Sequence, residues 1–388
     1  MPVSRITAFL FHTGGHDSPV ALTANSDKSF KGCDTYSPGF IFDLTDNEGT
    51  TGTIDEMRAL LAKDQNNARR IVPYMGGEDV LNSPTVSNYR YVIDFDDMTE
   101  EESRKWPDLM SIVEQRVRPE RLSLKTQQSA TRLQRLWWQF GYAANGMRQM
   151  AKERDRFLMH PFYSGHLAFV FLPSNVIVAT PNSVFAFSKY DGFSVLQSRV
   201  HEAWVRFVAS SFKDDLRYSP TDCFETFPFP ENFETDAKLE VVGKDYYEFR
   251  AALMLKNNEG LTKTYNRFHD PNETSAEIKK LRELHAAMDR AVLDAYGWTD
   301  LQPTCEFLLD YDEEEEDEED TGKARKKQKP WRHRWPDEFR DLVLARLLEL
   351  NKQRAETEKL SGAAAEAKQK KPGRRKGKPK DDGPPLFG

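Results

Sequence analysis

The distribution of charge along the chain most constrains what it can fold into. Residues 312–320 form an unbroken acidic run, and basic residues dominate 323–334 and 368–380. Blocks of like charge repel one another and stay solvated, so they do not join a hydrophobic core. We therefore expect a charged flexible connector over 312–336 and a disordered basic tail over 361–388. The folded part must be built from the remaining residues.

Composition and cysteine usage indicate an intracellular globular protein. The chain has 388 residues, of which 38% are hydrophobic, enough to build a core over two or three domains. No apolar stretch is long enough to span a membrane, and the first residues show no signal-peptide pattern. Cys33, Cys223 and Cys305 lie far apart and form no CxxC pair. These features predict a reduced, cytoplasmic protein.

Hydrophobic periodicity predicts an α+β fold. Alternating apolar residues indicate strands over 3–11, 40–44 and 89–95, and over the short segments 167–172, 176–180 and 184–187. Apolar residues at helical spacing, two of them after capping-box patterns, indicate helices over 54–63, 107–117, 193–207, 246–257, from 275 onward and over 337–360. We predict a mixed-sheet domain over 1–235, a helical region over 236–311 and a C-terminal helix over 337–360.

No catalytic motif is recognisable. The sequence has no phosphate-binding GxxxxGK[ST] loop, no GxGxxG after a strand, no GxSxG and no HExxH. His160 and His166 are close in sequence, but we interpret them as structural residues and predict no metal site.

An acidic cluster could form a metal-dependent nuclease site. Asp94, Asp96 and Asp97 precede Glu100, Glu101 and Glu102, and carboxylates that converge can bind a catalytic cation. However, Asp94 ends a predicted strand and the others precede a helix, where acidic side chains favour the helix dipole. We prefer this structural interpretation and keep an independent nuclease as an alternative function.

Basic and aromatic residues interleave in one segment. Phosphate binding requires several Lys or Arg side chains on one surface, and base edges are read by Arg, Lys, Asn or Gln. Because Glu114 and Glu120 lie among the basic residues, a solvated helix face is the alternative. The candidate DNA-binding residues in this segment, which lead to Trp137 and Trp138, are Arg116, Arg118, Arg121, Lys125, Arg132 and Arg135.

Several separated segments carry a specific resemblance. They are IVPYMGGED at 71–79 with RYVIDF at 90–95, RFLMHP at 156–161, HEAW at 201–204 through FKDDLRYSP at 212–220 to FPFP at 227–230, and LTKTYNRFHD at 261–270 through LRELH at 281–285 and MDR at 288–290 to YGW at 296–298. Together they resemble the C-terminal half of class I adenine-specific DNA methyltransferases of the type IIG and MmeI-like kind, including related methylases of phage-defence systems. The similarity continues to about residue 355.

The resemblance implies a division of labour. In that family this half holds the target-recognition domain and a helical region, the methyl donor is S-adenosylmethionine, and the product is N6-methyladenine. The glycine-rich cofactor loop and the [N/D/S]-P-P-[Y/F/W] motif of the catalytic half are missing, because the only Pro-Pro pair lies in Gly383-Pro-Pro-Leu386. We expect no cofactor in this chain, S-adenosylmethionine on a separate catalytic methyltransferase subunit, and remnant strands of the catalytic domain at 3–11. A split subunit and a truncated product both remain open.

The resemblance also suggests further DNA contacts. Lys213, Arg217 and Tyr218 follow a helix, and their alternative role is an internal ion pair with Asp214 or Asp215. A polar loop is predicted around Lys263, Tyr265 and Arg267. These side chains either contact DNA or the catalytic partner, or only hold the loop in its conformation. The favoured function is a target-recognition subunit that binds double-stranded DNA within a restriction-modification or phage-defence system. An interaction protein that has lost DNA recognition is the third alternative.

Overall fold

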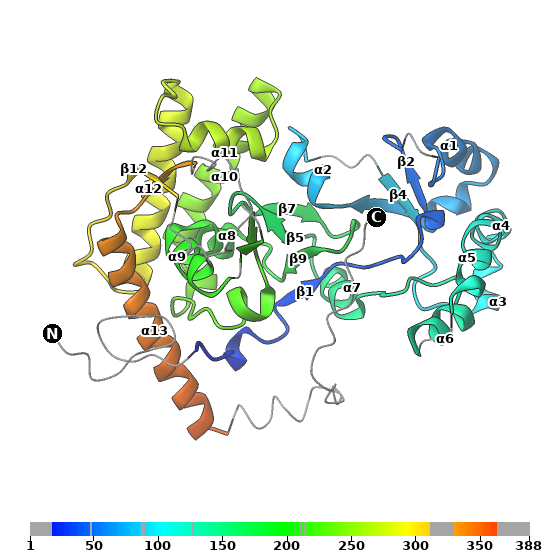
Figure 1. Ribbon diagram of the computed structural model, residues 1–388, viewed down its shortest axis with the longest axis horizontal. Coiled ribbons are helices and arrows are strands. Elements are labelled where there is room, and N and C mark those ends of the chain that lie inside the picture. The colour runs from blue at the N-terminus through cyan, green and yellow to red at the C-terminus, as the bar shows by residue number, and fades with distance from the viewer. Residues whose placement is uncertain are drawn as a thin grey trace, which may run out of the picture.

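The structure is a computed structural model (Figure 1). It describes residues 18–46, 49–86, 90–125, 128–209, 211–212, 215–310 and 330–362. The predicted strand over 3–11, the acidic run and the basic tail beyond Gly362 lie outside the described residues.

The strands in the described ranges form four small sheets. The first has the order β1 (Ser29–Lys31), β9 (Asn182–Phe185), β5 (Arg156–Pro161), β7 (Val170–Pro173), with antiparallel pairs throughout. The second has the order β2 (Ile41–Asp43), β4 (Arg90–Ile93), β3 (Ile71–Met75), β8 (Ile177–Val178), and its β3–β8 pair is parallel. The smaller sheets are β10 (Ser211–Phe212), β11 (Asp215–Arg217), β6 (Tyr163–Ser164), and the pair β12 (Glu306–Leu309), β13 (Trp331–Arg334).

The helices fall into two groups along the chain. The first group is α1 (Ile54–Lys63), α2 (Gly77–Asn82), α3 (Glu100–Ser103), α4 (Pro107–Arg116), α5 (Arg118–Ser123), α6 (Gln128–Arg135) and α7 (Asn145–Lys152). The second is α8 (Tyr190–Gln197), α9 (Arg199–Val208), α10 (Ala237–Asn257), α11 (Leu261–His269), α12 (Ala276–Ala295) and α13 (Asp337–Leu360). Short 3-10 or π turns occur at Thr23–Asn25, Pro38–Phe40, Gln65–Arg69, Pro220–Phe224 and Phe233–Thr235.

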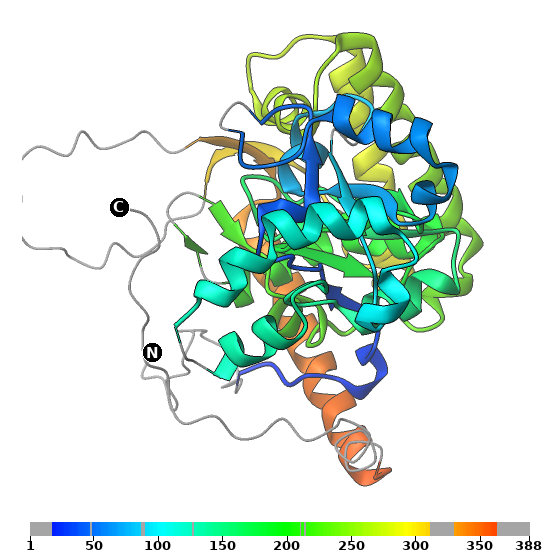
Figure 2. The ribbon, with the colours of Figure 1, turned by 90° about the vertical axis from the view of Figure 1, so that its right-hand side faces the viewer.

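The two groups of helices lie at opposite ends of the molecule. Figure 1 shows α1 and α3–α6 around β2 and β4 at one end, and α8–α13 at the other. The β1-β9-β5-β7 sheet lies between them, with α7 beside β1 (Figure 1). The view turned by 90° shows α13 extending below the rest of the second group (Figure 2). This arrangement confirms the predicted α+β class.

Helix boundaries were predicted well where a cap and an apolar stripe coincide. The Thr53 hydroxyl accepts a hydrogen bond from the Glu56 amide and starts α1, whose Ile54 and Met57 are buried. Helix α12 begins one residue later than the capping-box pattern Thr274-x-x-Glu277 predicts, because Ser275 is its cap and accepts from the Ile278 amide. The C-terminal helix predicted over 337–360 coincides with α13.

Three predictions about local structure were wrong. The helix predicted over 193–207 is two helices, because Ser198 is extended and caps α9 through the His201 amide. The segment around Lys263 is the helix α11 and not a loop. Part of the predicted flexible connector is strand β13, which pairs with β12 and buries Arg332 and Arg334.

One hydrophobic core runs through the predicted boundary at residue 235. Helix α10 packs closely on α8, and Gly243 makes this possible. A Cβ atom at Gly243 would lie 2.2 Å from Ser194 Oγ and 2.5 Å from the Tyr190 carbonyl oxygen. The predicted sheet domain and helical region are therefore successive parts of one packed body. Within the described ranges, no helix is both long and apolar enough to cross a bilayer.

Candidate nucleic-acid interface

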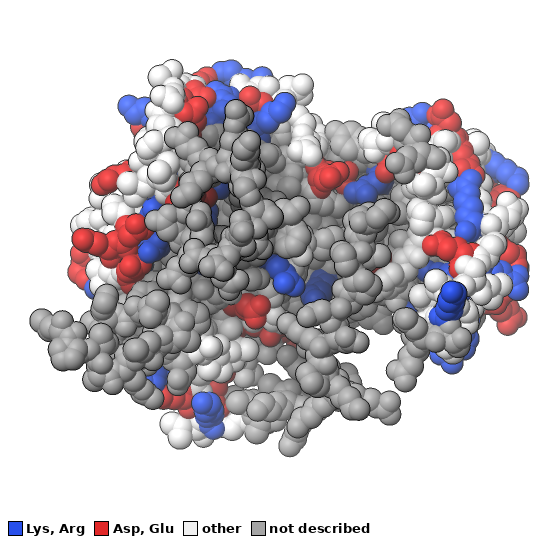
Figure 3. Space-filling model, in the orientation of Figure 1, with Lys and Arg blue, Asp and Glu red and all other residues white. Residues whose placement is uncertain are grey.

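The first two arginines of the basic segment are neutralised by carboxylates. Arg116 Nη2 lies 2.8 and 2.9 Å from the two carboxylate oxygens of Glu56. Arg118 Nη1 lies 2.5 Å from Glu114 Oε1, one helical turn back. Figure 3 shows the same intermixing of charge over the end of the molecule that carries α1 and α3–α6. These two side chains contribute little net charge for binding phosphate.

Arg121 is buried, which contradicts its predicted contact with DNA. Only 1% of the residue is exposed, and its guanidinium lies 5.2 Å from the centre of the Phe40 ring. Burial lowers the pKa of Arg121 to about 10, so the group is still charged at neutral pH. Its side chain donates to the backbone carbonyl oxygens of Thr35 (2.6 Å), Leu136 (3.2 Å), Trp137 (3.0 Å) and Gln139 (2.6 Å). Arg121 therefore ties two loops together from inside the protein.

Three cations of the same segment remain at the surface. Lys125, Arg132 and Arg135 are exposed, and none forms an ion pair with another described residue. Arg132 donates to the Gly141 carbonyl oxygen at 2.7 Å, a contact that leaves its charge unneutralised. Arg132 and Arg135 lie one turn apart on α6, so they project from the same side of the helix. This is the strongest concentration of unneutralised positive charge in the predicted segment.

The second predicted group is divided between surface and core. Arg217 is exposed on β11, directly across from Tyr163 of β6, and its guanidinium lies 5.5 Å from the centre of the Phe162 ring. Tyr218 is fully buried and its hydroxyl lies 3.0 Å from His201 Nε2, so its predicted DNA contact is contradicted. Lys213 lies outside the described residues. Only Arg217 of this group is shown to be available to a ligand.

The third group lies on helix α11. Lys263 is exposed. Arg267 forms ion pairs with Glu273 (2.7 Å) and Glu259 (3.1 Å), so its role is to hold the ends of the helix in place. Tyr265 is buried and its hydroxyl lies 2.8 Å from the hydroxyl of Tyr246. Lys263 is therefore the accessible member of this group.

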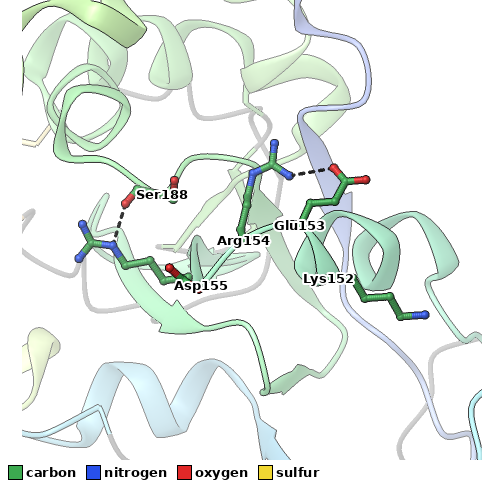
Figure 4. Close-up of a pocket in the computed structure, with 6 residues that line it drawn as sticks. Lys152, Glu153, Arg154, Asp155 and Ser188 are labelled. Atoms are coloured by element: carbon green, nitrogen blue, oxygen red, sulfur yellow. Dashed lines mark hydrogen bonds and ion pairs between the residues drawn. The ribbon is translucent and has the colours of Figure 1, made fainter.

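An open pocket of about 480 Å³ lies between α7 and the start of β5. Figure 4 shows its charged side chains. Arg154 lies 3.6 Å from Glu153, and Arg156 donates to the Ser188 carbonyl oxygen at 2.7 Å. The Arg156 guanidinium also lies 3.9 Å from the centre of the Phe171 ring. Contacts within the protein therefore hold the side chains of both Arg154 and Arg156 at this pocket.

The acidic cluster has a structural role. Arg148 binds both carboxylate oxygens of Asp94, at 2.6 and 3.1 Å, and is 3.4 Å from Asp96. Among the residues that the structure describes, no three His, Cys, Asp or Glu side chains come together as metal ligands would. His160 and His166 are buried, and burial lowers the pKa of each to about 4. These observations support the structural interpretation of both groups.

The sequence analysis missed two exposed tyrosines beside Arg132. Tyr36 is 57% exposed and Tyr142 is 44% exposed. The backbones of Asp34 and Tyr142 are joined by two hydrogen bonds of 2.9 Å each. No local pattern marks these residues, because their contact joins two loops that are far apart in sequence.

Comparison with known proteins identifies relatives of this chain. Residues 43–231 match the family described as MmeI, target recognition domain. Over 98 residues, 25% of this chain, the sequence is 33% identical to DNA methyltransferase A of Bacillus subtilis (strain 168) and covers 10% of that protein. The structure of the type IIL restriction-modification enzyme MmeI in complex with DNA superposes with a TM-score of 0.58 and 17% identity. That superposition covers 91% of this chain and 39% of the solved chain, and at this identity it shows a shared fold.

Proposed function

We propose that the chain recognises double-stranded DNA for an adenine-specific methyltransferase. The premise is that residues 43–231 match the target recognition domain of the MmeI family, in agreement with the resemblance. The chain would serve a restriction-modification or phage-defence system. The observation that carries the proposal is that the matched segment contains the exposed, unneutralised cations Lys125, Arg132, Arg135 and Arg217.

The geometry supports a distribution of roles among these cations. Lys125, Arg132 and Arg135 come from one stretch of α5–α6 and are suited to phosphates, which require charge but no fixed geometry. Arg217 projects from a strand beside Tyr163, and its planar guanidinium can donate two parallel hydrogen bonds to a guanine edge. We assign the first set to positioning and Arg217 to contact with a base.

The proposal places the chemistry on another polypeptide segment. The sequence contains neither the glycine-rich cofactor loop nor the Pro-Pro-aromatic motif that holds a flipped adenine. We propose that a separate catalytic subunit binds S-adenosylmethionine and transfers its methyl group to adenine N6. This chain would then fix the position of the duplex relative to that subunit.

The test is selection of duplexes from a random pool by the full chain, with and without the product of the adjacent upstream gene, over a salt series. We expect enrichment of one short adenine-containing sequence, strengthened by the partner. Replacing Lys125, Arg132 and Arg135 together by Gln should make the plot of log affinity against log salt shallower by about 2 to 3. Replacing the carboxylate-paired Arg116 and Arg118 by Gln is the matched control and should change the slope by less than about 1.

Other outcomes would identify the alternatives. Weak binding without enrichment, abolished by salt, would reject target recognition and favour an interaction protein. Metal-dependent cleavage of duplex by the purified chain would favour a nuclease. Asp94→Ala together with Asp96→Ala would then show whether the acidic cluster is responsible.

A further inference from the structure

Tyr36 is held at the surface in an unusual conformation. Its backbone φ is 50°, in the left-handed region that bulky residues rarely adopt, and the residue is 57% exposed. The ring lies directly against Gly141, because a Cβ atom there would be 1.6 Å from Tyr36 Cδ2. Only glycine at position 141 leaves room for the ring in this place.

The surrounding residues fix this conformation at an energetic cost. The Tyr36 amide donates to Asp34 Oδ1 at 2.9 Å, and buried Arg121 donates to the Thr35 carbonyl oxygen at 2.6 Å. Arg121 also donates to the carbonyl oxygens of Leu136, Trp137 and Gln139, so the Tyr36 loop is fixed to a second loop. The cost lies in the backbone of Tyr36, because a positive φ at a bulky residue costs about 1–3 kcal/mol. Because the Tyr36 ring faces solvent, it contributes little hydrophobic stabilisation. A strained backbone that is kept to hold a side chain at the surface points to a function of that side chain.

The surroundings of the ring match a nucleic acid. Arg132 donates to the carbonyl oxygen of Gly141, the residue that supports the ring, and Arg135 follows one turn later on α6. Two carboxylates lie nearby. Asp34 accepts from the Tyr36 amide and the Thr180 hydroxyl, and Glu120 accepts from the Ser37 hydroxyl, contacts that orient both groups but leave their charge unneutralised. An exposed aromatic face beside cations is the arrangement on which bases stack while phosphates are neutralised.

We propose that Tyr36 stacks on an unpaired or unstacked base of the bound DNA, while Arg132 contacts an adjacent phosphate. This inference rests on the proposed function, because it assumes that DNA is the ligand. It adds a specific role: the loop containing Tyr36 holds a base out of its regular stack, and the loop around Gly141 supports the ring from behind. Tyr142, exposed on the same pair of loops, borders the site.

The first experiment compares Tyr36→Ala with Tyr36→Phe in the full chain, using the duplexes enriched from the random pool. We expect Tyr36→Ala to weaken binding by roughly five- to 150-fold, the usual effect of losing one base–aromatic stack, and Tyr36→Phe to bind within about twofold of the natural chain. The salt slope should stay unchanged in both variants, whereas Arg132→Gln should make it shallower by about 1. Thermal unfolding of each variant controls for loss of folding.

The second experiment needs no variant. The same duplexes carry 5-iodouracil in place of thymine, and irradiation should cross-link the natural chain at Tyr36. Unchanged affinity of Tyr36→Ala, or cross-links only at other residues, would overturn the inference while leaving DNA recognition intact. Failure of the natural chain to enrich any duplex would instead reject the proposed function, and the stacking role with it.

Discussion

Replacement of Arg121 by Met tests whether this arginine is a structural tie. The substitution keeps much of the side-chain volume and removes every hydrogen bond to the four carbonyl oxygens of Thr35, Leu136, Trp137 and Gln139. Hydrogen bonds to a charged group contribute about 1.5–3 kcal/mol each, but the variant also avoids the cost of burying the cation, which is the cause of its lowered pKa. We therefore expect a net loss of about 3–5 kcal/mol in the free energy of unfolding. Four carbonyl oxygens lose their donor, at about 1–3 kcal/mol for each one that stays buried and unpaired, and the avoided burial of the cation offsets part of this loss.

Urea unfolding followed by tryptophan fluorescence measures this loss, since the buried Trp137 and Trp138 lie next to the carbonyl oxygens that Arg121 binds. Arg118→Ala is the matched control, because Arg118 lies on the same helix in an exposed ion pair, and it should cost less than about 1 kcal/mol. Arg121→Lys should fall between the two, since an ammonium group cannot reach all four carbonyls. A free energy of unfolding for Arg121→Met within about 1 kcal/mol of the natural chain would refute the reasoning.

Two further predictions concern stability. All the histidines that the structure describes have pKa values lowered by burial, so each is neutral in the folded chain and binds protons more readily when unfolded: His160, His166, His201, His269, His285 and His333. The free energy of unfolding should thus be highest above about pH 6.5. It should fall as the pH drops toward 4, by up to about 1.4 kcal/mol per pH unit for each histidine. A urea midpoint that stays constant between about pH 6.5 and 5 would contradict this. Gly243→Ala should lower the free energy of unfolding by about 1–3 kcal/mol, because the added methyl group clashes with α8. The higher helix propensity of alanine opposes this by about 1 kcal/mol. A variant more stable than the natural chain would show that the packing can relax.

The sequence predicted those parts of the fold that local interactions determine. Helices α1 and α13 begin and end close to the predicted residues, and α12 begins close to its predicted start, because caps and apolar stripes act within a few turns of the chain. The break at Ser198 was missed because the apolar stripe continues through it, although a serine at that place is a recognisable cap. Strand β13 was missed because its residues are basic, and only pairing with β12 makes it a strand.

The candidate interface was predicted only as a region, because the state of each charge depends on tertiary contacts. The sequence shows Glu114 close to Arg118, but Arg116 is paired with Glu56, which lies 60 residues away. Nothing local distinguishes Arg121, which is buried, from Arg132, which is exposed on the next helix. The same limit hid Tyr36, whose support comes from Gly141 on a separate loop.

The predicted contacts that stay accessible can supply only part of the affinity for DNA. Of the predicted contacts that the structure describes, those left exposed and without an ion pair are Lys125, Arg132, Arg135, Arg217 and Lys263. If all five met phosphates, the slope of log affinity against log salt would be about −4 to −5, so these charges alone would contribute only a modest affinity at physiological salt. A recognition unit of this kind gains most from a second protein surface that holds the same duplex. We therefore expect the catalytic partner to raise the affinity for the recognised sequence at every salt concentration, with little change in the slope of log affinity against log salt. A partner effect seen only in that slope would argue against joint recognition.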